Sequence, residues 1–201
     1  MRYGYDIILN SVFVRRAPRG SEASAAEIMG RIIVFRSVTR GSDVENKGLQ
    51  EDIVKRLISE AAGARKKAYA PYSRFFVGAA VLAEDGRVFT GCNVENASYP
   101  AGSCAETIAV NKAVSEGVRT IKAVAIVGGA VDTDDSAADK PGDGDKLARV
   151  DDYIYPCGIC RQVISEFRSP EGTIVIVARS EEDYRIYDIS ELLVGAFTLK
   201  Q

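Results

Sequence analysis

Histidine is absent from this chain. Imidazole is therefore excluded both as a metal ligand and as a general base, so a zinc site in this protein must be built on thiolates. The sequence also has no apolar run of the roughly 18–20 residues that a membrane-spanning helix requires. On this ground we expect no membrane partner.

The chain also has no large excess of positive or negative charge, because the formal net charge of the 201 residues is only −2. Residues 1–47 hold eight Lys or Arg against five Asp or Glu, and residues 131–152 hold eight Asp against three Lys or Arg. The remaining chain is balanced, whereas a nucleic-acid-binding domain usually carries a basic stripe. The balance favours a small neutral substrate and predicts no nucleic-acid partner.

Cysteine is scarce, with four residues in the whole chain. Four cysteines could form two disulfides, but Cys157 and Cys160 stand in a C-x-x-C pair and Cys104 is followed closely by an acid. This pattern indicates metal chemistry in a reducing compartment, so we expect a cytoplasmic protein. Cys92 is interpreted as a small buried hydrophobic residue in a strand.

Residues 1–47 show weak periodicity and are predicted to be an N-terminal extension to a domain spanning 48–201. The segment contains seven arginines, which suits an organelle-targeting peptide, but its five acidic residues do not. An unstructured extension and an upstream start codon are equally open interpretations.

The pattern of apolar residues from position 48 onward predicts alternating helices and strands. Helical spacing is found after Gln50 and over 104–117, 157–167 and 190–193. Short apolar runs predict strands over 76–83, 87–92, 121–127, 173–178 and 184–187. The composition of 129–152 predicts a solvated acidic loop insertion. This order predicts a three-layer α/β/α fold with a mixed five-stranded sheet.

Two cysteine motifs carry the chemistry of the chain. Cys104-Ala105-Glu106 and Cys157-Gly158-Ile159-Cys160 each begin a predicted helix, whose N-terminal end favours the thiolate form of a cysteine. Three thiolates leave the fourth position of a tetrahedral zinc ion open, which is the arrangement of a catalytic site. Glu106 follows the first ligand by two residues and is predicted to accept a proton from water at that open position.

Four segments resemble landmarks of a known family. Residues 91–106, which read GCNVENASYPAGSCAE, closely resemble the core motif of the homotetrameric zinc-dependent cytidine deaminases. Residues 156–162 look like the second zinc motif of that family, and 71–80 and 191–197 match its two remaining landmarks. The resemblance covers about residues 50–198 in order, and it implies the cytidine-deaminase-like fold and a homotetramer with shared active sites.

The resemblance also implies a role for individual residues. Cys104, Cys157 and Cys160 would bind one zinc ion per subunit, and Glu106 would move protons while cytidine or deoxycytidine is hydrolysed to uridine or deoxyuridine and ammonia, in pyrimidine salvage. The implied substrate-binding residues are Phe75, Asn93, Glu95, Tyr99, Ala105 and Phe197. Of these, Tyr99 and Phe197 would approach from neighbouring subunits.

One position departs from the family pattern at the metal. Arginine usually follows the catalytic glutamate, and here Thr107 takes that place. Three thiolates on Zn²⁺ leave a net charge of −1, so the lack of an arginine predicts a weaker Lewis acid. Arg161, beside Cys160, is a candidate to offset that charge.

Three classes of function are compatible with these motifs. The first is a nucleoside hydrolase, the second a zinc-stabilised nucleoside-binding protein without turnover, and the third a thiol–disulfide protein that uses Cys157 and Cys160. The presence of Glu106 argues against the second class, and a redox protein needs neither Asn93 nor Glu95. The implied ribose clamp of Asn93 and Glu95 also favours a nucleoside over a free base.

Overall fold

The computed structural model of this chain describes residues 48–130, 150 and 152–198. The predicted extension 1–47 and most of the predicted acidic insertion lie outside these residues. The described helices are α2 (Glu51–Arg65), α3 (Ala105–Ser115), α4 (Gly158–Glu166), α5 (Ile189–Leu192) and the short 3-10 helix η1 (Tyr99–Ala101). The described strands are β1 (Phe75–Ala83), β2 (Val88–Cys92), β3 (Ile121–Ala130), β4 (Ile174–Ala178) and β5 (Tyr184–Asp188).

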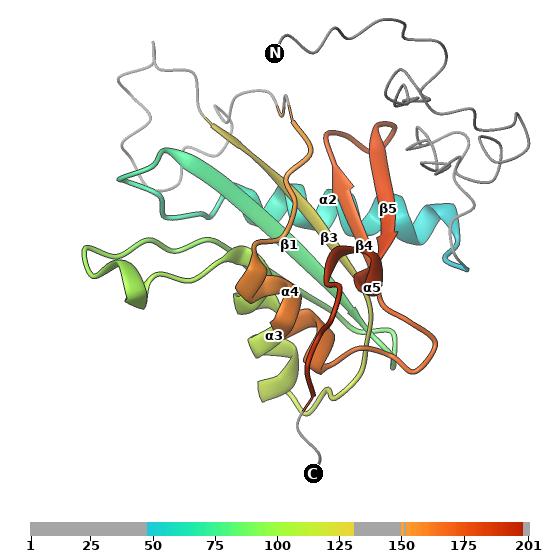
Figure 1. Cartoon of the computed structure of the whole chain (residues 1–201). Helices are drawn as coiled ribbons and strands as arrows, with labels where there is room; N and C mark the ends of the chain where they lie inside the picture. The colour runs from blue at the N-terminus through green and yellow to red at the C-terminus, as the bar shows by residue number, and fades with distance from the viewer. Residues whose placement is uncertain (1–47, 131–149, 151, 199–201) are drawn as a thin grey trace, which may run out of the picture. The chain divides into compact units, whose positions relative to one another are not determined.

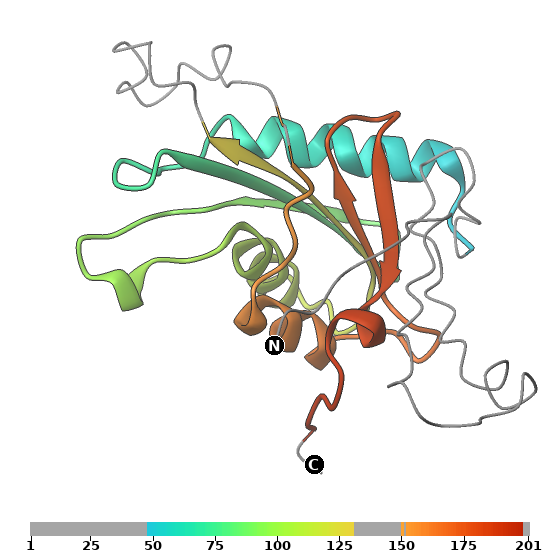
Figure 2. The ribbon, with the colours of Figure 1, turned by 45° about the horizontal axis from the view of Figure 1, so that its top comes forward.

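The five strands form one mixed sheet in the order β2-β1-β3-β4-β5 (Figure 1). The central pair β3–β4 is parallel, and the other three pairs are antiparallel. Helix α2 covers one face of the sheet, while α3, α4 and α5 lie on the other (Figure 2). The predicted three-layer α/β/α fold with a mixed five-stranded sheet is therefore confirmed.

Strand alternation divides the interior into two cores, one on each side of the sheet. In β1, Ala79, Val81 and Ala83 face the core shared with α3 and α4, whereas Ala80 and Leu82 face the core beneath α2. Because successive side chains of a strand point to opposite faces, a strand buried on both sides must be apolar throughout. The uninterrupted run of buried small and apolar residues after Lys122 in β3 has this origin.

Two strand glycines let helices approach the sheet closely. A Cβ atom on Gly78 in β1 would overlap the carbonyl oxygen of Ala61 in α2. A Cβ atom on Gly91 in β2 would overlap the carbonyl oxygen of Ala105 at the start of α3. The two glycines thus bring backbone against backbone on opposite faces of the sheet.

One predicted boundary is wrong. The acidic loop was expected to begin at residue 129, but β3 continues to Ala130, which pairs with Phe75 at the start of β1. Gly128 and Gly129 read as loop residues because glycine is unfavourable in strands, yet pairing with a nine-residue β1 overrides that preference. The loop can therefore begin no earlier than residue 131.

Across the described part of the chain, no helix combines the length and the apolar character needed to cross a bilayer.

We predict that Gly91→Ala moves α3 away from β2 and lowers the free energy of unfolding by about 1–3 kcal/mol, because the added methyl group overpacks a backbone contact. Denaturant unfolding measures this loss. Gly63→Ala is the matched control, since its added methyl group on α2 meets no atom within 4 Å. The control should gain about 0.4–1 kcal/mol. Equal stability of Gly91→Ala and the unmodified protein would contradict the packing argument.

Candidate metal centre

The three predicted cysteine ligands converge although Cys157 lies 53 residues after Cys104, and Cys160 three residues further on. The Sγ atom of Cys157 is 3.9 Å from that of Cys104 and 3.4 Å from that of Cys160, and all three sulfurs lie within 4.8 Å of one another. Tetrahedral zinc with Zn–S bonds of about 2.3 Å separates its sulfur ligands by about 3.8 Å. The thiol set therefore fits one zinc ion, and the prediction of that cofactor is confirmed.

Two helix N-termini present these thiols. Cys104 is the N-cap of α3 and Cys157 is the N-cap of α4, where its Sγ accepts a hydrogen bond from the backbone N–H of Cys160 at 3.4 Å. Cys160 lies in the first turn of α4 and is fully buried. Helices α3 and α4 lie side by side on the same face of the sheet (Figures 1 and 2), so both helix starts turn their partial positive charge toward the sulfurs.

Hydrogen bonding within the thiol cluster separates the acidities of its members. Bonds from Cys160 and Cys157 lower the pKa of Cys104 to about 6, against the opposing effect of burial. The pKa of Cys160 is raised because its thiol is the donor to Cys104 and because it is buried. In the metal-free site these shifts favour the thiolate at Cys104 and the proton at Cys160, and the binding of zinc to three thiolates must release the remaining thiol protons.

Glu106 is the buried carboxyl group of this centre. It is the second residue of α3 and is only 5% exposed. Burial raises its pKa to about 7, and the nearby Cys104 thiolate contributes in the same direction, while hydrogen bonds from its own N–H and from Cys160 oppose the shift. A carboxyl group with this pKa can both accept and return a proton near neutral pH.

Asn93, at the end of β2, ties that strand to the start of β1. Its Oδ1 accepts from the N–H of Val77 at 2.8 Å, and its Nδ2 donates to the carbonyl oxygen of Phe75 at 2.8 Å. An amide has two hydrogens and two carbonyl lone pairs, and these bonds use one of each. Asn93 therefore fixes the segment that carries Phe75 and retains hydrogen-bonding capacity for a ligand.

Glu95 reaches the same segment two residues later. Its Oε2 accepts hydrogen bonds from the N–H groups of Tyr72 at 2.9 Å and Ser73 at 3.2 Å. Desolvation is the largest single effect on the pKa of Glu95 and acts to raise it, but hydrogen bonds from the Ser73 side chain and from the N–H groups of Tyr72 and Ser73 together hold that pKa below its usual value. The carboxylate is consequently ionised at neutral pH and positioned by the turn before β1.

A short backbone bridge connects this Asn–x–Glu segment to the metal ligands. The N–H of Val94 donates to the carbonyl of Ser103 at 2.9 Å, and the reverse bond has the same length. Ser103 immediately precedes Cys104, so the bridge sets the strand end beside the start of α3. The sequence predicted that Asn93 and Glu95 point the same way, and both side chains do reach residues 72–77.

Of three further predicted substrate-binding residues, Ala105 is buried, whereas Tyr99 and Phe197 are exposed. Ala105 is fully buried in the first turn of α3, between Cys104 and Glu106. Tyr99 is 80% exposed on η1, where its ring meets that of Tyr72 edge-on at 6.5 Å. Phe197 is 66% exposed, and its carbonyl accepts from Gln162 on α4. Both aromatic rings therefore face outward on their own chain.

Arg161, the candidate to offset the charge of the three thiolates, forms hydrogen bonds with two backbone carbonyl groups. Its Nε donates to the carbonyl of Pro156 at 2.8 Å, and a terminal nitrogen donates to the carbonyl of Leu192 at 2.9 Å. The guanidinium thus fastens the loop that carries Cys157 to the end of α5. Arg161 therefore supports the position of a ligand, and the offset of the thiolate charge by its guanidinium stays a prediction.

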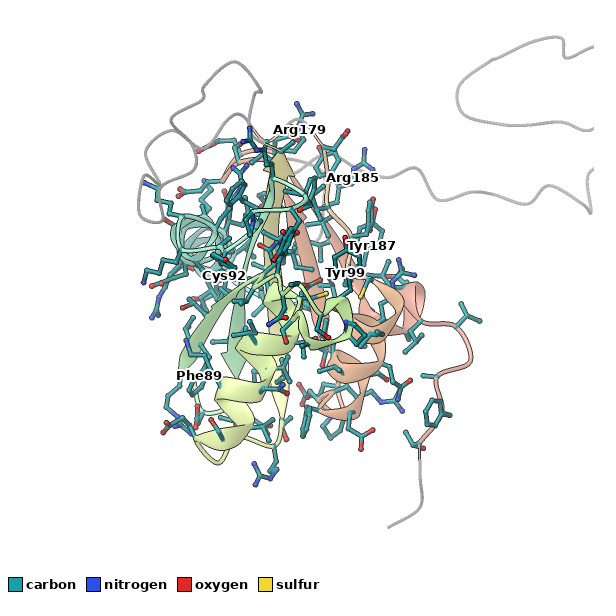
Figure 3. The ribbon with its side chains drawn as sticks, turned by 90° about the vertical axis from the view of Figure 1, so that its left-hand side faces the viewer. Phe89, Cys92, Tyr99, Arg179, Arg185 and Tyr187 are labelled. Carbon is teal, nitrogen blue, oxygen red and sulfur yellow. The ribbon has the colours of Figure 1, made fainter. Side chains whose placement is uncertain are left out.

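A tyrosine–arginine cluster braces the same loop from β5, and sequence reasoning missed it. The hydroxyl groups of Tyr155 and Tyr187 are 2.8 Å apart, and Arg185 donates to Tyr155 at 3.2 Å. Figure 3 labels Arg185 and Tyr187 on the same side of the ribbon, with Tyr187 nearer to the helices. The sequence signal was the alternation of β5 itself, because Arg185 and Tyr187 share one side of that strand.

Arg65 is a second residue that the sequence did not single out. Its Nε donates to the carbonyl of Phe76 at 3.0 Å, and a terminal nitrogen donates to that of Gly129 at 3.1 Å. Only 5% of the residue is exposed, and burial lowers its pKa. The end of α2 thereby holds the first residues of β1, next to those that Asn93 holds.

A thiol triad with a buried carboxyl group at the same helix start belongs to the class of zinc-dependent hydrolytic centres. The sequence profile of the cytidine and deoxycytidylate deaminase zinc-binding region matches residues 52–177. The chain is a member of this deaminase family.

Individual relatives agree with that assignment over most of their length. A cytidine deaminase of Sporosarcina psychrophila is 43% identical over 146 residues, which are 72% of this chain and 91% of the relative. One from Halalkalibacterium halodurans is 45% identical over 142 residues, or 71% and 92%. The crystal structure of a cytidine deaminase from Burkholderia pseudomallei superposes with a TM-score of 0.57 at 40% identity, covering 71% of this chain and 97% of that one.

Proposed function

We propose that this protein hydrolyses the exocyclic amine of cytidine and deoxycytidine, giving uridine or deoxyuridine and ammonia for pyrimidine salvage. The single observation that carries the proposal is the convergence of three sulfurs within 4.8 Å of one another at the helix start that also bears the buried Glu106. The relatives named above, which are cytidine deaminases, support the choice of substrate.

Cys104, Cys157 and Cys160 would hold the zinc ion. When bound, zinc supplies the Lewis acidity that makes a water molecule nucleophilic near neutral pH. Glu106 accepts a proton from the attacking water, protonates ring N3 and later delivers a proton to the departing amine, as in zinc-dependent nucleobase deaminases generally. A C4–O bond forms and the C4–N bond to the amine breaks, so water and cytidine are converted to uridine and ammonia.

Substrate placement is assigned to the strand end beside the metal ligands. Asn93 retains an amide hydrogen and a lone pair for a ribose hydroxyl, and the Glu95 carboxylate can accept from a second hydroxyl. Phe75, whose carbonyl Asn93 holds, lies against the nucleoside, and the backbone of Ala105 contacts the base. This division of roles explains why two polar residues are fixed by the turn that precedes β1.

We also propose that four copies of the chain assemble and share their active sites. Large apolar side chains are exposed on the described surface, and a subunit interface would bury them. The most exposed are Val194, Tyr99, Ile159 and Phe197. In the assembly, Tyr99 and Phe197 would complete the site of a neighbouring subunit, which accounts for their outward orientation.

Residues 48–201 are proposed to be sufficient for catalysis, with residues 1–47 as an accessory extension. The family match begins at residue 52, and the metal ligands and substrate-binding residues all follow it. A cytoplasmic location is proposed because the four cysteines are free thiols, the state that a reducing compartment maintains.

The first prediction from this proposed function tests the proton transfer. Glu106→Gln should retain one zinc per chain and lose deamination by at least about 10²–10⁴-fold, because the amide cannot accept a proton. The fall in ultraviolet absorbance and the release of ammonia from cytidine measure turnover, and metal analysis measures zinc. Glu116→Gln, exposed beyond the other end of α3, is the control and should remain active. Full activity of Glu106→Gln would remove this residue from the mechanism.

The second prediction tests shared sites by complementation. Glu106→Gln and Phe197→Ala subunits should each be impaired alone, and co-assembly should restore activity wherever an intact Glu106 meets a neighbour's intact Phe197. Glu106→Gln with Cys157→Ala is the control, because these residues serve the same chain's metal centre and cannot complement. Light scattering should give about four times the 21.7 kDa chain mass. Activity equal to the simple average of the two variants would contradict shared sites.

The third prediction concerns the extension. A chain that begins at Lys47 should fold, bind zinc and deaminate cytidine with the KM and kcat of the full chain, because every residue assigned to the site lies downstream. A large loss of kcat with unchanged zinc content would assign residues 1–47 a part in catalysis.

A further inference from the structure

Thr107 stands one residue after Glu106, in the first turn of α3, and the proposed mechanism assigns it no part. Its Oγ1 lies 3.6 Å from the Sγ of Cys160, which is fully buried in the first turn of α4. The contact joins the two helices that carry the metal ligands, directly at one of those ligands.

The direction of this hydrogen bond follows from the chemistry of the site. In the metal-free protein either group can be the donor. A cysteine that binds zinc is a thiolate without a proton, so it can only accept. With metal bound, the hydroxyl of Thr107 must therefore donate to Cys160.

The excess negative charge of the site makes a hydrogen-bond donor at sulfur stabilising. Three thiolates exceed the charge of Zn²⁺ by one, and the excess resides on sulfur. The Sγ of Cys157 has a backbone donor at 3.4 Å, the N–H of Cys160. The printed geometry of Arg161 directs its Nε and one terminal nitrogen to the carbonyls of Pro156 and Leu192, and not to a thiol. For Cys160, the neutral hydroxyl of Thr107 is the donor that the described residues place at its sulfur.

We propose that Thr107 is a positioning residue of the metal centre, whose hydroxyl donates a hydrogen bond to the Cys160 thiolate, fixes the orientation of that ligand and draws electron density from its sulfur. The inference rests on the proposed function in that it requires zinc at the three cysteines. Hydrogen-bond partners of metal ligands commonly change metal affinity by about 10–100-fold.

The experiment compares Thr107→Val, which keeps the shape and removes the hydroxyl, with Thr107→Ser, which keeps the hydroxyl. Zinc affinity is measured by competition with a chromophoric chelator, and Co²⁺-loaded protein reports the sulfur-to-metal charge-transfer band. Thr107→Val should bind zinc about 10-fold more weakly or worse, and its band should move to longer wavelength because the sulfur is more electron-rich. Thr107→Ser should keep the affinity and band of the unmodified protein.

Thr90→Val in β2 is the matched control, since it makes the same substitution at a half-buried position away from the sulfurs, and it should change neither readout. Equal zinc affinity and an unshifted band in Thr107→Val would overturn the inference and leave the proposed function intact. Thr107→Ser behaving like Thr107→Val would also overturn it, because the methyl group and not the hydroxyl would then matter. An unmodified protein that binds no zinc would instead refute the proposed function, and this inference with it.

Discussion

The contact between β2 and the first turn of α3 determines where the chemistry of this protein can take place. Gly91 has no side chain, so the carbonyl of Ala105 can lie directly over the strand. Ala105 separates Cys104 from Glu106, and any change in the height of this turn above the sheet moves both residues together. The same strand continues into Asn93, so one short stretch of chain supports both the metal ligand and the proposed substrate contacts.

On the opposite face of the sheet, a strand glycine again lets a helix backbone approach closely. Gly78 in β1 admits the backbone of α2 at Ala61, and Arg65 at the end of that helix holds the carbonyl of Phe76. The start of β1 is thus fixed by α2 on one side and by the Asn93 amide on the other. The start of β1, where we propose that the substrate binds, is therefore held from two layers, and this support favours a preorganised site.

The fold was largely predictable because a strand that is buried on both faces has a nearly continuous apolar sequence. The short apolar run that follows Lys122 indicated a central strand, and the order of helices and strands indicated the mixed sheet. The thiol cluster was predictable for a chemical reason, since cysteine thiolate is the soft zinc ligand that remains when histidine is absent. Cys104 was joined to a motif 53 residues away because three thiolates leave one open position on zinc, and the family resemblance implied the same set.

The partners of the polar side chains could not be read from the sequence. Asn93 and Glu95 bind backbone groups of residues 72–77, whose turn passes through a left-handed Arg74 with φ of 53°. Arg161 serves two carbonyls, and Thr107 meets a sulfur on another helix. Each contact depends on the local backbone shape of a remote segment, which residue type and spacing do not encode. The end of β3 was misplaced for a related reason, because pairing with β1 overrode a glycine pair.

An all-sulfur ligand set also governs which ions can compete for the centre. Thiolates are soft donors, whereas magnesium, calcium and manganese prefer carboxylate, carbonyl and water oxygens. The most abundant divalent ions of a cell are therefore rejected by donor chemistry alone, without a size filter or a gated entrance. Soft thiophilic metals such as Cu(I) would be the real competitors, and the lack of a single imidazole in the chain leaves no second ligand type with which to discriminate against them.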